Sequence, residues 1–333
     1  MDHTFDGNRQ VSCLVNPKAC RETLLSYVAT KEPKRLAVIG AGPAGLAYAV
    51  VAAQRGHKVD LFDSASEIGG QFNLAKRIPG KEEFHETLRY FQRMLEIHGV
   101  TLHLNTRADA PMLRKLNFDE VIVATGIEPR IPAIAGVDHP KVVGYIDAIL
   151  GTRPVGKRVA IVGAGGIGFD VAELLSHAGI SASLDINVFA KEWGIDFSNH
   201  PRGGVTGVQP EVAKSSRIIT LLQRKTDPVG KSLGRTTGWT HRLTLTRRRV
   251  QMVNGVEYLK IDDEGLHTLV GGKPELFAVD TVVLCAGQLP SQGLFNDLQS
   301  CGVRATLVGG AFEAAELDAK RAIEQACRLA SAD

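Results

Sequence analysis

A glycine triplet of the form G-x-G-x-x-G occurs twice in this 333-residue chain, each time directly after a short apolar run. The two triplets are Gly40, Gly42 and Gly45, and Gly163, Gly165 and Gly168. Between a strand and a helix, the first glycine permits a tight turn, the second lets a pyrophosphate approach the backbone, and the third lets the helix pack against the strand. The helix also points unpaired N–H groups and its positive dipole end at the phosphates. The pattern predicts an α/β fold with two Rossmann-like dinucleotide-binding domains.

The first triplet is followed by an expected strand at residues 58–62, which leads into Asp63, 23 positions beyond Gly40. A carboxylate at this place accepts hydrogen bonds from an adenosine ribose. Gly69 and Gly70 follow, and they allow the backbone to run close against a ligand. Two dinucleotide sites in one chain suggest one bound flavin and one exchanging nicotinamide nucleotide, and these features favour FAD in the first site.

The second triplet follows an apolar run at residues 159–162, but no acid stands at the matching distance. A long stretch containing glycine and proline intervenes, and the next expected strand, residues 217–222, leads into Gln223, Arg224 and Lys225. A guanidinium or ammonium group can pair with the 2′-phosphate of NADPH, which a carboxylate would repel. We therefore expect NADPH in preference to NADH at this site. The alternative is that Arg224 and Lys225 only solvate the end of a strand.

Two further strand endings suggest where the chain crosses between domains. Residues 120–124 lead into Thr125 and Gly126, and residues 281–284 lead into residues 285–287, so each is a strand followed by a glycine turn. They lie at matching places after the two triplets, which predicts that the NADPH domain is inserted into a discontinuous FAD domain. The expected division is 34–150 and 278–333 for the FAD domain and 151–277 for the NADPH domain.

Composition excludes several classes of protein. With 39 Lys and Arg against 36 Asp and Glu, the formal net charge of +3 is too small for a nucleic-acid groove or a membrane-surface patch. No apolar run approaches the ~20 residues that span a bilayer. The five cysteines contain no C-x-x-C pair, so the dithiol chemistry of thioredoxin reductases is not expected. We expect a cytoplasmic protein with neither nucleic acid nor membrane as a partner.

Several longer segments carry a family resemblance. They are SCLVNPKACRE, VIGAGPAGLA, EIGGQFNLAKRIPGKEEFHETLRYF, VDHPKV, EWGID, LQRK, TTGWTHR, CAGQ and ELDAKRAI. Over essentially the whole chain, the sequence resembles the carboxy-terminal part of bacterial NADPH-dependent 2,4-dienoyl-CoA reductases and, more distantly, of trimethylamine dehydrogenase. The resemblance implies that NADPH gives hydride to FAD, that single electrons then pass through a 4Fe-4S cluster, and that FMN in a TIM barrel reduces dienoyl-CoA in the β-oxidation of unsaturated fatty acids.

The glycine pattern and the resemblance together predict two sets of contacts. The expected FAD contacts are Gly40, Gly42, Ala44, Gly45, Asp63, Gly70, Gln71, Ala108, Thr125, Gly126, Gly287 and Gly310. The expected NADPH contacts are Gly163, Gly165, Gly166, Ile167, Gly168, Arg224 and Lys225.

The chain departs from the family pattern in two places. Cys13 resembles the last of the family's four cluster ligands, but the other three ligands and the barrel, with the family's catalytic Tyr and His, are absent. One thiolate cannot hold a 4Fe-4S cluster, so we expect residues 1–33 to be the remnant of an iron–sulfur linker. Cys13 would be a lone thiol or a ligand completed by a partner, and FMN and the cluster belong to the full-length family or to a partner protein. Phe312 stands where the family offers an acidic residue, which puts one polar flavin contact in doubt.

Other residues give weaker signals. Trp239 and His241 lie in a Gly- and Thr-rich stretch with Lys231 and Arg235, and they form either a lid over the nicotinamide-binding face or a packed tryptophan and a solvated histidine. Cys285 is expected in the core. We expect no cluster of His, Cys and carboxylates with the spacing of metal ligands.

Three functions compete at this point. The first is an FAD-containing, NADPH-oxidising module of a 2,4-dienoyl-CoA reductase. The second is a freestanding NADPH:acceptor reductase that serves a separate electron carrier. The third is a truncated fragment that binds FAD without catalysing a reaction.

Overall fold

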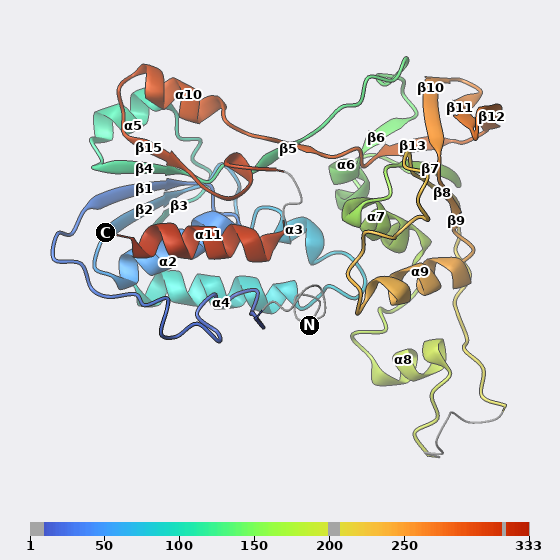
Figure 1. Cartoon of the computed structure of the whole chain (residues 1–333), viewed down its shortest axis with the longest axis horizontal. Coiled ribbons are helices and arrows are strands. Elements are labelled where there is room, and N and C mark those ends of the chain that lie inside the picture. The colour runs from blue at the N-terminus through green and yellow to red at the C-terminus, as the bar shows by residue number, and fades with distance from the viewer. Residues whose placement is uncertain (1–9, 199–206, 315–317, 333) are drawn as a thin grey trace.

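The computed structural model describes residues 10–198, 207–314 and 318–332, which form two α/β lobes side by side along the long axis of the molecule (Figure 1). Each lobe is built on a sheet of five parallel strands. Parallel strands need crossover connections and are covered on both faces, which explains why the central strands read as unbroken apolar runs. The predicted α/β fold class is confirmed.

The first lobe has the strand order β15-β4-β1-β2-β3. Its strands are β1 (Arg35–Ile39), β2 (Lys58–Phe62), β3 (Thr101–His103), β4 (Glu120–Val123) and β15 (Ala305–Leu307). Its helices are α2 (Pro43–Gln54), α3 (Phe72–Ala75), α4 (Phe84–Ile97), α5 (Ala110–Leu116), α10 (Gly293–Ser300), α11 (Ala319–Ser331) and the 3₁₀ turn η1 (Gly309–Ala311). The helices α2, α4 and α11 pack together on one face of the sheet, and α5 and α10 cover the other face (Figure 1).

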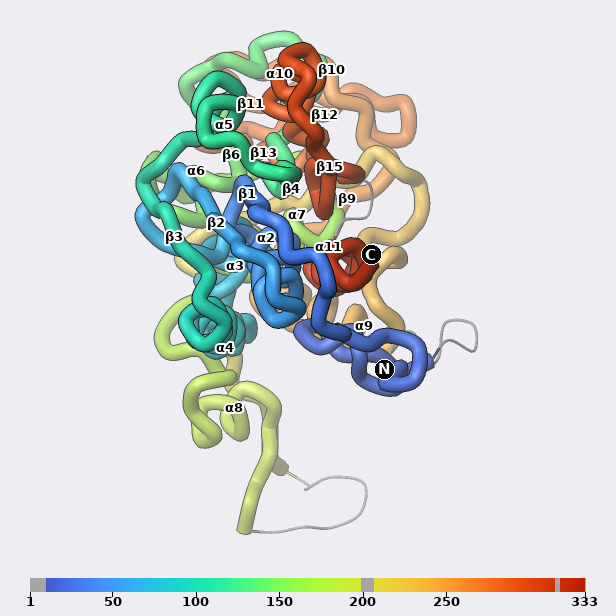
Figure 2. The backbone as a smooth tube through the Cα atoms, turned by 90° about the vertical axis from the view of Figure 1, so that its left-hand side faces the viewer, coloured from blue at the N-terminus to red at the C-terminus, as the bar shows by residue number. Residues whose placement is uncertain are grey.

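The second lobe has the strand order β6-β13-β7-β8-β9. Its strands are β6 (Val142–Gly144), β7 (Arg158–Val162), β8 (Ile218–Leu222), β9 (Gln251–Val253) and β13 (Thr281–Leu284). Its helices are α6 (Tyr145–Leu150), α7 (Gly166–Ser176), α8 (Ile186–Trp193) and α9 (Gly238–Arg247). An antiparallel sheet of β10 (Val256–Asp262), β11 (Gly265–Val270) and β12 (Lys273–Phe277) packs against it through a shared apolar cluster. Helix α8 projects away from this lobe in both views of the backbone (Figures 1 and 2).

The chain crosses between the lobes along two short strands, β5 (Ile127–Pro129) and β14 (Gln288–Pro290), which pair antiparallel with each other. The first crossing follows Gly126 and the second follows Gly287, as the two strand endings suggested. The expected boundaries at 150/151 and 277/278 are therefore displaced. Strand β6 precedes the first expected boundary and β13 follows the second, so the expectation assigned both to the FAD domain. In the structure they pair with one another, and β13 pairs with β7, so both belong to the second sheet.

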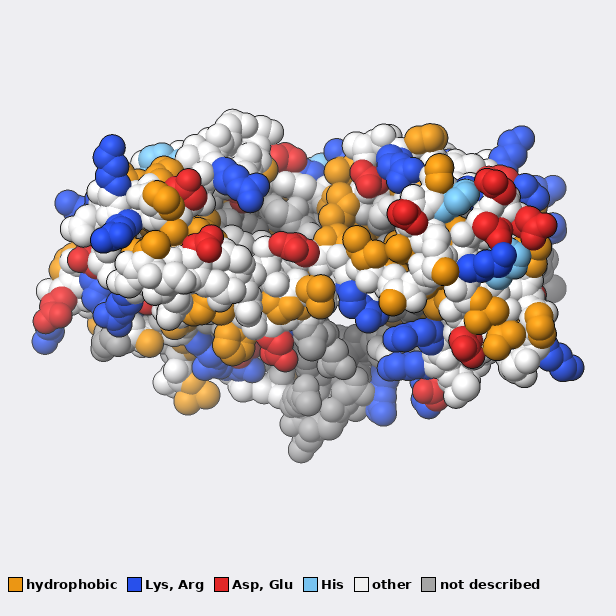
Figure 3. Space-filling view, turned by 90° about the horizontal axis from the view of Figure 1, so that it is seen from above, with side chains coloured by type: hydrophobic (Ala, Val, Ile, Leu, Met, Phe, Trp, Pro, Cys, Tyr) orange, Lys and Arg blue, Asp and Glu red, His pale blue; other side chains and the backbone are white. Residues whose placement is uncertain are grey.

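The surface shows no segregation of charge on the face seen from above, where acidic and basic side chains are interspersed over both lobes (Figure 3). Among the described residues, no helix is both long enough and apolar enough to cross a bilayer.

Candidate dinucleotide sites

The first glycine triplet forms the turn between β1 and α2. Gly40 has a φ of +106°, and a Cβ added there would lie 2.4 Å from the carbonyl oxygen of Ala124. A Cβ on Gly45 would lie 1.8 Å from the carbonyl oxygen of Gly40, so the helix packs directly against the turn. Gly42 is the N-cap of α2, and the nearest atom to its Cβ position is the Cα of Gly70 at 4.0 Å. Packing requires the first and third glycines, while the second leaves the helix N-terminus open to a ligand.

The second triplet repeats these contacts between β7 and α7. Gly163 has a φ of +109°, and an added Cβ would lie 2.3 Å from the carbonyl oxygen of Cys285. A Cβ on Gly168 would lie 1.9 Å from the carbonyl oxygen of Gly163, and nothing lies within 4 Å of the Cβ position of Gly165. The two turns are therefore built in the same way, as the spacing predicted.

The residues that follow β2 and β8 occupy equivalent places in the two lobes. The N–H of Asp63 donates to the carbonyl of His103 at the end of β3, and the N–H of Gln223 donates in the same way to Val253 at the end of β9. An uncharged amide thus stands in the second lobe where a carboxylate stands in the first.

The carboxylate of Asp63 is fixed beside the first glycine turn. Its Oδ2 accepts a hydrogen bond of 2.6 Å from the N–H of Ala41, and its Oδ1 accepts one of 2.8 Å from the N–H of Ala65. Each carboxylate oxygen has a further lone pair, so the group can still accept hydrogen bonds from a ligand.

A cavity of about 370 Å³ opens beside this turn. Nine of the expected FAD contacts line it: Gly40, Gly42, Ala44, Asp63, Gly70, Gln71, Thr125, Gly126 and Gly310. Much of the remaining wall is apolar and includes Ile78, Phe84, Ile127, Ile149 and Ile167. A phosphate-binding turn beside an apolar wall fits a dinucleotide that carries a flat ring system.

Three of the expected FAD contacts do not line the first cavity. Gly45 lies beneath the turn, where it permits close packing rather than contact with a ligand. Ala108 is buried in the apolar core with Leu113. Gly287 lines the second cavity instead, because β13 belongs to the second sheet.

The second cavity has a volume of about 810 Å³ and opens beside the second glycine turn. Six of the seven expected NADPH contacts line it: Gly163, Gly165, Gly166, Ile167, Arg224 and Lys225. Gly168 lies beneath the turn, like Gly45 in the first lobe.

Tyr258, which comes from β10, also lines the second cavity, and no sequence pattern predicted it. Among the described residues its buried hydroxyl has no hydrogen-bond partner. Burial raises the pKa of Tyr258, and the charge of the neighbouring Arg224 opposes that rise. An unpaired buried hydroxyl next to an exposed guanidinium is a polar feature that a bound ligand could satisfy.

The two cavities adjoin. Ile167 and Gln288 line both of them, and Tyr145 lines the first. The side-chain amide of Gln288 donates a hydrogen bond of 3.2 Å to the hydroxyl of Tyr145. Both glycine turns thus open toward one boundary between the lobes.

An ion pair crosses between the lobes at the wall of the first cavity. The Nζ of Lys81, just before α4, lies 2.7 Å from both carboxylate oxygens of Asp170 on α7. Burial raises the pKa of Asp170, and Lys81 opposes that rise. The two residues are 89 positions apart and belong to no common motif, so no sequence pattern predicted the pair.

The segment containing Lys81 holds the lobes together more broadly, and we name residues 78–82 the latch. Ile78 is buried in the apolar core of the second lobe. The N–H of Gly80 donates to the hydroxyl of Ser181, and the carboxylate of Glu82 accepts a hydrogen bond of 2.6 Å from Ser183. A segment of the first lobe therefore contributes packing and polar contacts to the second.

Trp239 and His241 are not among the residues that line the second cavity, so they form no lid over it. Trp239 is half-exposed and lines a separate shallow pocket with Arg242. The Nδ1 of His241 lies 3.2 Å from a carboxylate oxygen of Glu173, and this hydrogen bond raises the pKa of the histidine. Both residues lie on α9, which packs beside α7 rather than over the second cavity.

The thiols form no shared site. All five cysteines are free, and within the described chain Cys13 is not part of a group of three potential metal ligands. Cys285 is buried, as expected, although it also borders the second cavity, and burial raises its pKa.

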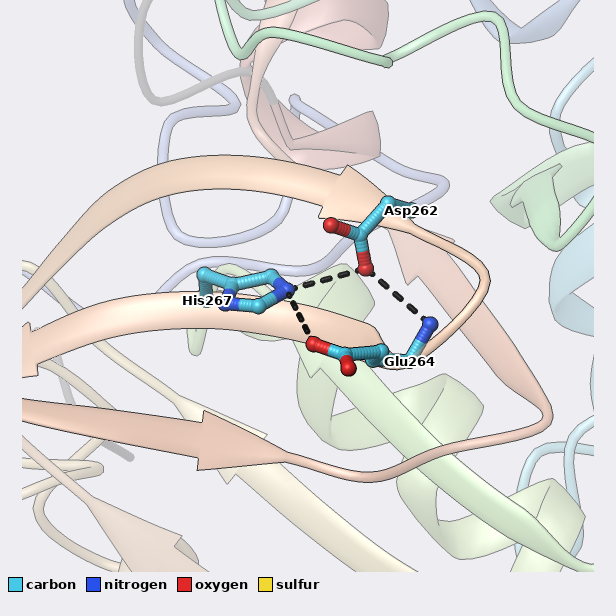
Figure 4. A group of neighbouring side chains, drawn as sticks. All are labelled: Asp262, Glu264 and His267. Atoms are coloured by element: carbon cyan, nitrogen blue, oxygen red, sulfur yellow. Dashed lines mark hydrogen bonds and ion pairs between the residues drawn. The ribbon is translucent and has the colours of Figure 1, made fainter.

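The expectation that no His and carboxylate side chains cluster was wrong. Asp262, Glu264 and His267 converge at the turn between β10 and β11 (Figure 4). However, Lys260 lies 2.7 Å from Asp262, and His267 lies 2.9 Å from it. These contacts hold the pKa of Asp262 well below its usual range. The carboxylate is already paired with an ammonium group that would repel a cation, so we assign no metal here.

Comparison with known proteins identifies the family. Residues 34–309 match the family model of pyridine nucleotide-disulphide oxidoreductases, and the chain belongs to this family. Membership implies binding of FAD and of NAD(P)H.

The curated relatives include reductases and dehydrogenases. A metal reductase of Desulforamulus reducens is 30% identical over 317 residues, which cover 94% of this chain and 46% of that protein. A bilirubin reductase of Mediterraneibacter gnavus is 29% identical over 324 residues, which cover 96% of this chain and 44% of that protein. The chain thus spans about half the length of these relatives. Its family membership identifies it as a flavin-dependent oxidoreductase module.

Solved structures show the same fold. A 2-naphthoyl-CoA reductase in complex with 2-naphthoyl-CoA has a TM-score of 0.83 at 22% identity, over 99% of this chain and 45% of that chain. The thioredoxin reductase of T. acidophilum has a TM-score of 0.58 at 15% identity, over 90% of this chain and 97% of that chain.

Proposed function

We propose that this chain oxidises NADPH with FAD as the acceptor, with FAD in the first cavity and NADPH in the second. The observation that carries the proposal is the shared boundary of the two cavities at Ile167 and Gln288. Bound FAD would supply a hydride acceptor that can return the two electrons singly. The glycines at the N-terminus of α2 would bind its pyrophosphate, and Asp63 would orient its adenosine ribose.

The nested domain arrangement belongs to the same proposal. The first lobe, interrupted between Gly126 and Gln288, would be the FAD-binding domain, and the second lobe would be the inserted NADPH-binding domain. The lining of each cavity supports this division, because each is built mainly from one lobe. The five free cysteines support a reducing, cytoplasmic setting.

A preference for NADPH over NADH rests on the end of β8. Gln223 takes the place that Asp63 has in the first lobe, so the residue at that position carries no negative charge, although the carboxylate of Glu257 also lines the cavity. Arg224 and Lys225 line the cavity and supply cations. Arg224→Glu should raise the KM for NADPH far more than the KM for NADH, whereas Lys273→Glu on β12 should change neither. An equal effect of Arg224→Glu on both nucleotides would contradict the preference.

The electron acceptor beyond FAD lies outside this chain in our proposal. The long shared segments support a 2,4-dienoyl-CoA reductase that acts on unsaturated fatty acids, in which a barrel domain or partner protein carries FMN and most of the 4Fe-4S ligands. Cys13 is half-buried in the segment that precedes β1, where the family places its last cluster ligand. Alone, the chain should reduce artificial acceptors with NADPH but leave dienoyl-CoA unreduced.

The decisive experiment is to extract and identify the cofactor of the purified chain and then titrate the FAD-loaded protein with NADPH without oxygen. We expect FAD, and we expect the oxidised-flavin band near ~450 nm to bleach. Absence of FAD binding, or a band that NADPH leaves unchanged, would overturn the proposal.

A further inference from the structure

Gln288 is the residue at which the two cavities meet. It is the first residue of β14 and lines both cavities. Its backbone is set by Gly287, which has a φ of +103° and hence a conformation that side chains disfavour. The guanidinium of Arg130 donates to the carbonyl of Ala286 and fixes the same turn from the opposite strand.

The order of strands indicates which end of NADPH would reach Gln288, given the function proposed above. In the second sheet, β7 lies between β8 and β13. Arg224 and Lys225 follow β8, the glycine turn follows β7, and Gln288 comes shortly after β13. A dinucleotide with its 2′-phosphate beside β8 and its pyrophosphate at the glycine turn extends its nicotinamide toward the β13 side. The nicotinamide therefore arrives at the boundary with the first cavity.

Within the described chain, one hydrogen bond holds the side chain of Gln288, and its other hydrogen-bonding groups remain unused. Its Nε2 donates to the hydroxyl of Tyr145, whose side chain is only 2% exposed. Among the described residues, none donates a hydrogen bond to its Oε1. The amide therefore keeps a free acceptor and a second N–H at the cavity boundary. A nicotinamide carboxamide offers one carbonyl acceptor and an NH₂ donor, which complement these two groups.

We propose that Gln288 binds the carboxamide of the nicotinamide ring through an amide–amide pair and thereby orients the ring toward the first cavity. Tyr145 acts as a positioning residue, because its hydroxyl fixes the rotamer of Gln288. Ile167 closes the apolar side of the same boundary.

The test compares ligands with and without the carboxamide. Binding of NADP⁺, of its 3-acetylpyridine analogue and of 2′,5′-ADP is measured by calorimetry on the FAD-loaded protein. The acetyl group keeps the carbonyl but lacks the N–H donor, and 2′,5′-ADP lacks the nicotinamide. The variants are Gln288→Leu and Tyr145→Phe, and the matched control is Gln292→Leu, whose amide binds the carbonyl of Ala311 and lines neither cavity.

Gln288→Leu should weaken NADP⁺ about tenfold, as expected for the loss of one to two net hydrogen bonds. The affinity for 2′,5′-ADP should change by no more than about twofold, because this ligand lacks the nicotinamide and binds at a distance from Gln288. The acetylpyridine analogue should lose less than NADP⁺ does, because only one hydrogen bond is removed. Tyr145→Phe should weaken NADP⁺ with the same ranking of ligands but to a smaller extent, and Gln292→Leu should change none of the three.

Two outcomes would overturn this inference but not the proposed function. In the first, Gln288→Leu weakens the binding of NADP⁺ and of 2′,5′-ADP equally, which indicates a distorted lobe. In the second, it weakens the binding of neither ligand. Failure of the unmodified protein to bind NADP⁺ would instead overturn the proposed function and this inference together. The flavin spectrum of each variant reports separately whether the first cavity is intact.

Discussion

The glycines of the two turns serve different purposes, and the difference is visible in what a side chain would meet. At Gly45 and Gly168 an added Cβ would overlap the carbonyl oxygen of the preceding turn, so these positions set how closely helix and strand pack. At Gly165 the Cβ position is open and the backbone φ is −81°, which any residue can adopt. Only absence of a side chain toward the ligand explains glycine there.

This distinction predicts opposite outcomes for two neighbouring substitutions. Gly168→Ala should lower the stability by about 1–3 kcal/mol, as overpacking does, because the Cβ would lie 1.9 Å from a carbonyl oxygen. Gly165→Ala should leave the melting temperature unchanged but weaken NADP⁺ binding more than about tenfold, since the methyl group blocks the pyrophosphate. Thermal unfolding and calorimetry check the pair. Normal NADP⁺ binding by Gly165→Ala would contradict the assignment of the second turn.

His241 gives the second lobe a pH-dependent contact. Its hydrogen bond to Glu173 raises its pKa above the usual value, with Lys81 and Asp170 as the other charged groups nearby. A raised folded-state pKa means that the stabilisation is complete below about pH 6.5 and is lost as the pH rises through the folded-state pKa. His241→Gln should therefore lower the melting temperature more at pH 6 than at pH 8.5. The control is His85→Gln, at an exposed position. If the decrease in melting temperature of His241→Gln does not depend on pH, the ion pair between His241 and Glu173 contributes nothing to stability.

At the scale of elements, the ion pair between α7 and the segment before α4 couples two parts of the chain that share no motif. The side chains of Lys81 and Asp170 are 33% and 20% exposed, so each would be left incompletely solvated without its partner. Removal of one partner of a fully buried pair costs about 3–5 kcal/mol, and partial exposure reduces that cost.

We therefore predict that Lys81→Met and Asp170→Leu each lower the free energy of unfolding by about 1–3 kcal/mol. The double variant should lose less than the sum of the two, because it leaves no unpaired charge. The loss in Lys81→Met should be larger at pH 8 than at pH 5, since protonation of Asp170 relieves the uncompensated charge. Urea unfolding of the unmodified protein, the two single variants and the double variant completes a double-mutant cycle. Strictly additive losses of unfolding free energy would show that the two side chains do not interact.

The elements also show what sequence can and cannot predict. Each glycine turn was predicted correctly, because its signal is local: an apolar strand, a glycine triplet and a helix. The membership of β6 and β13 was predicted incorrectly, because an apolar strand followed by a glycine turn looks alike in either sheet. Which sheet a strand joins is decided by its hydrogen-bonded neighbours, here β7 for β13. The latch was invisible for the same reason, since its partners lie about a hundred residues away in sequence.

At the scale of the whole molecule, the two lobes are joined at two separate places. One is the ribbon of β5 and β14, and the other is the latch at residues 78–82. A single connection would allow one lobe to swing about it, whereas two separated connections resist rotation. The two cavities therefore adjoin without any rearrangement of the lobes. We expect hydride transfer to need no large movement of either lobe.

A covalent bridge across the latch tests this directly. Cysteines in place of Glu82 and Ser183, whose side chains are hydrogen-bonded across the lobes, can be joined by a short bis-maleimide in a background where Cys13, Cys20 and Cys301 are serine. The bridged protein should reduce its FAD with NADPH at the same rate as the unbridged variant, because the cavities already adjoin. Treatment with a monofunctional maleimide controls for modification. Anaerobic stopped-flow absorbance measures the rate, and strong slowing on bridging alone would mean that the lobes must rotate before hydride can pass.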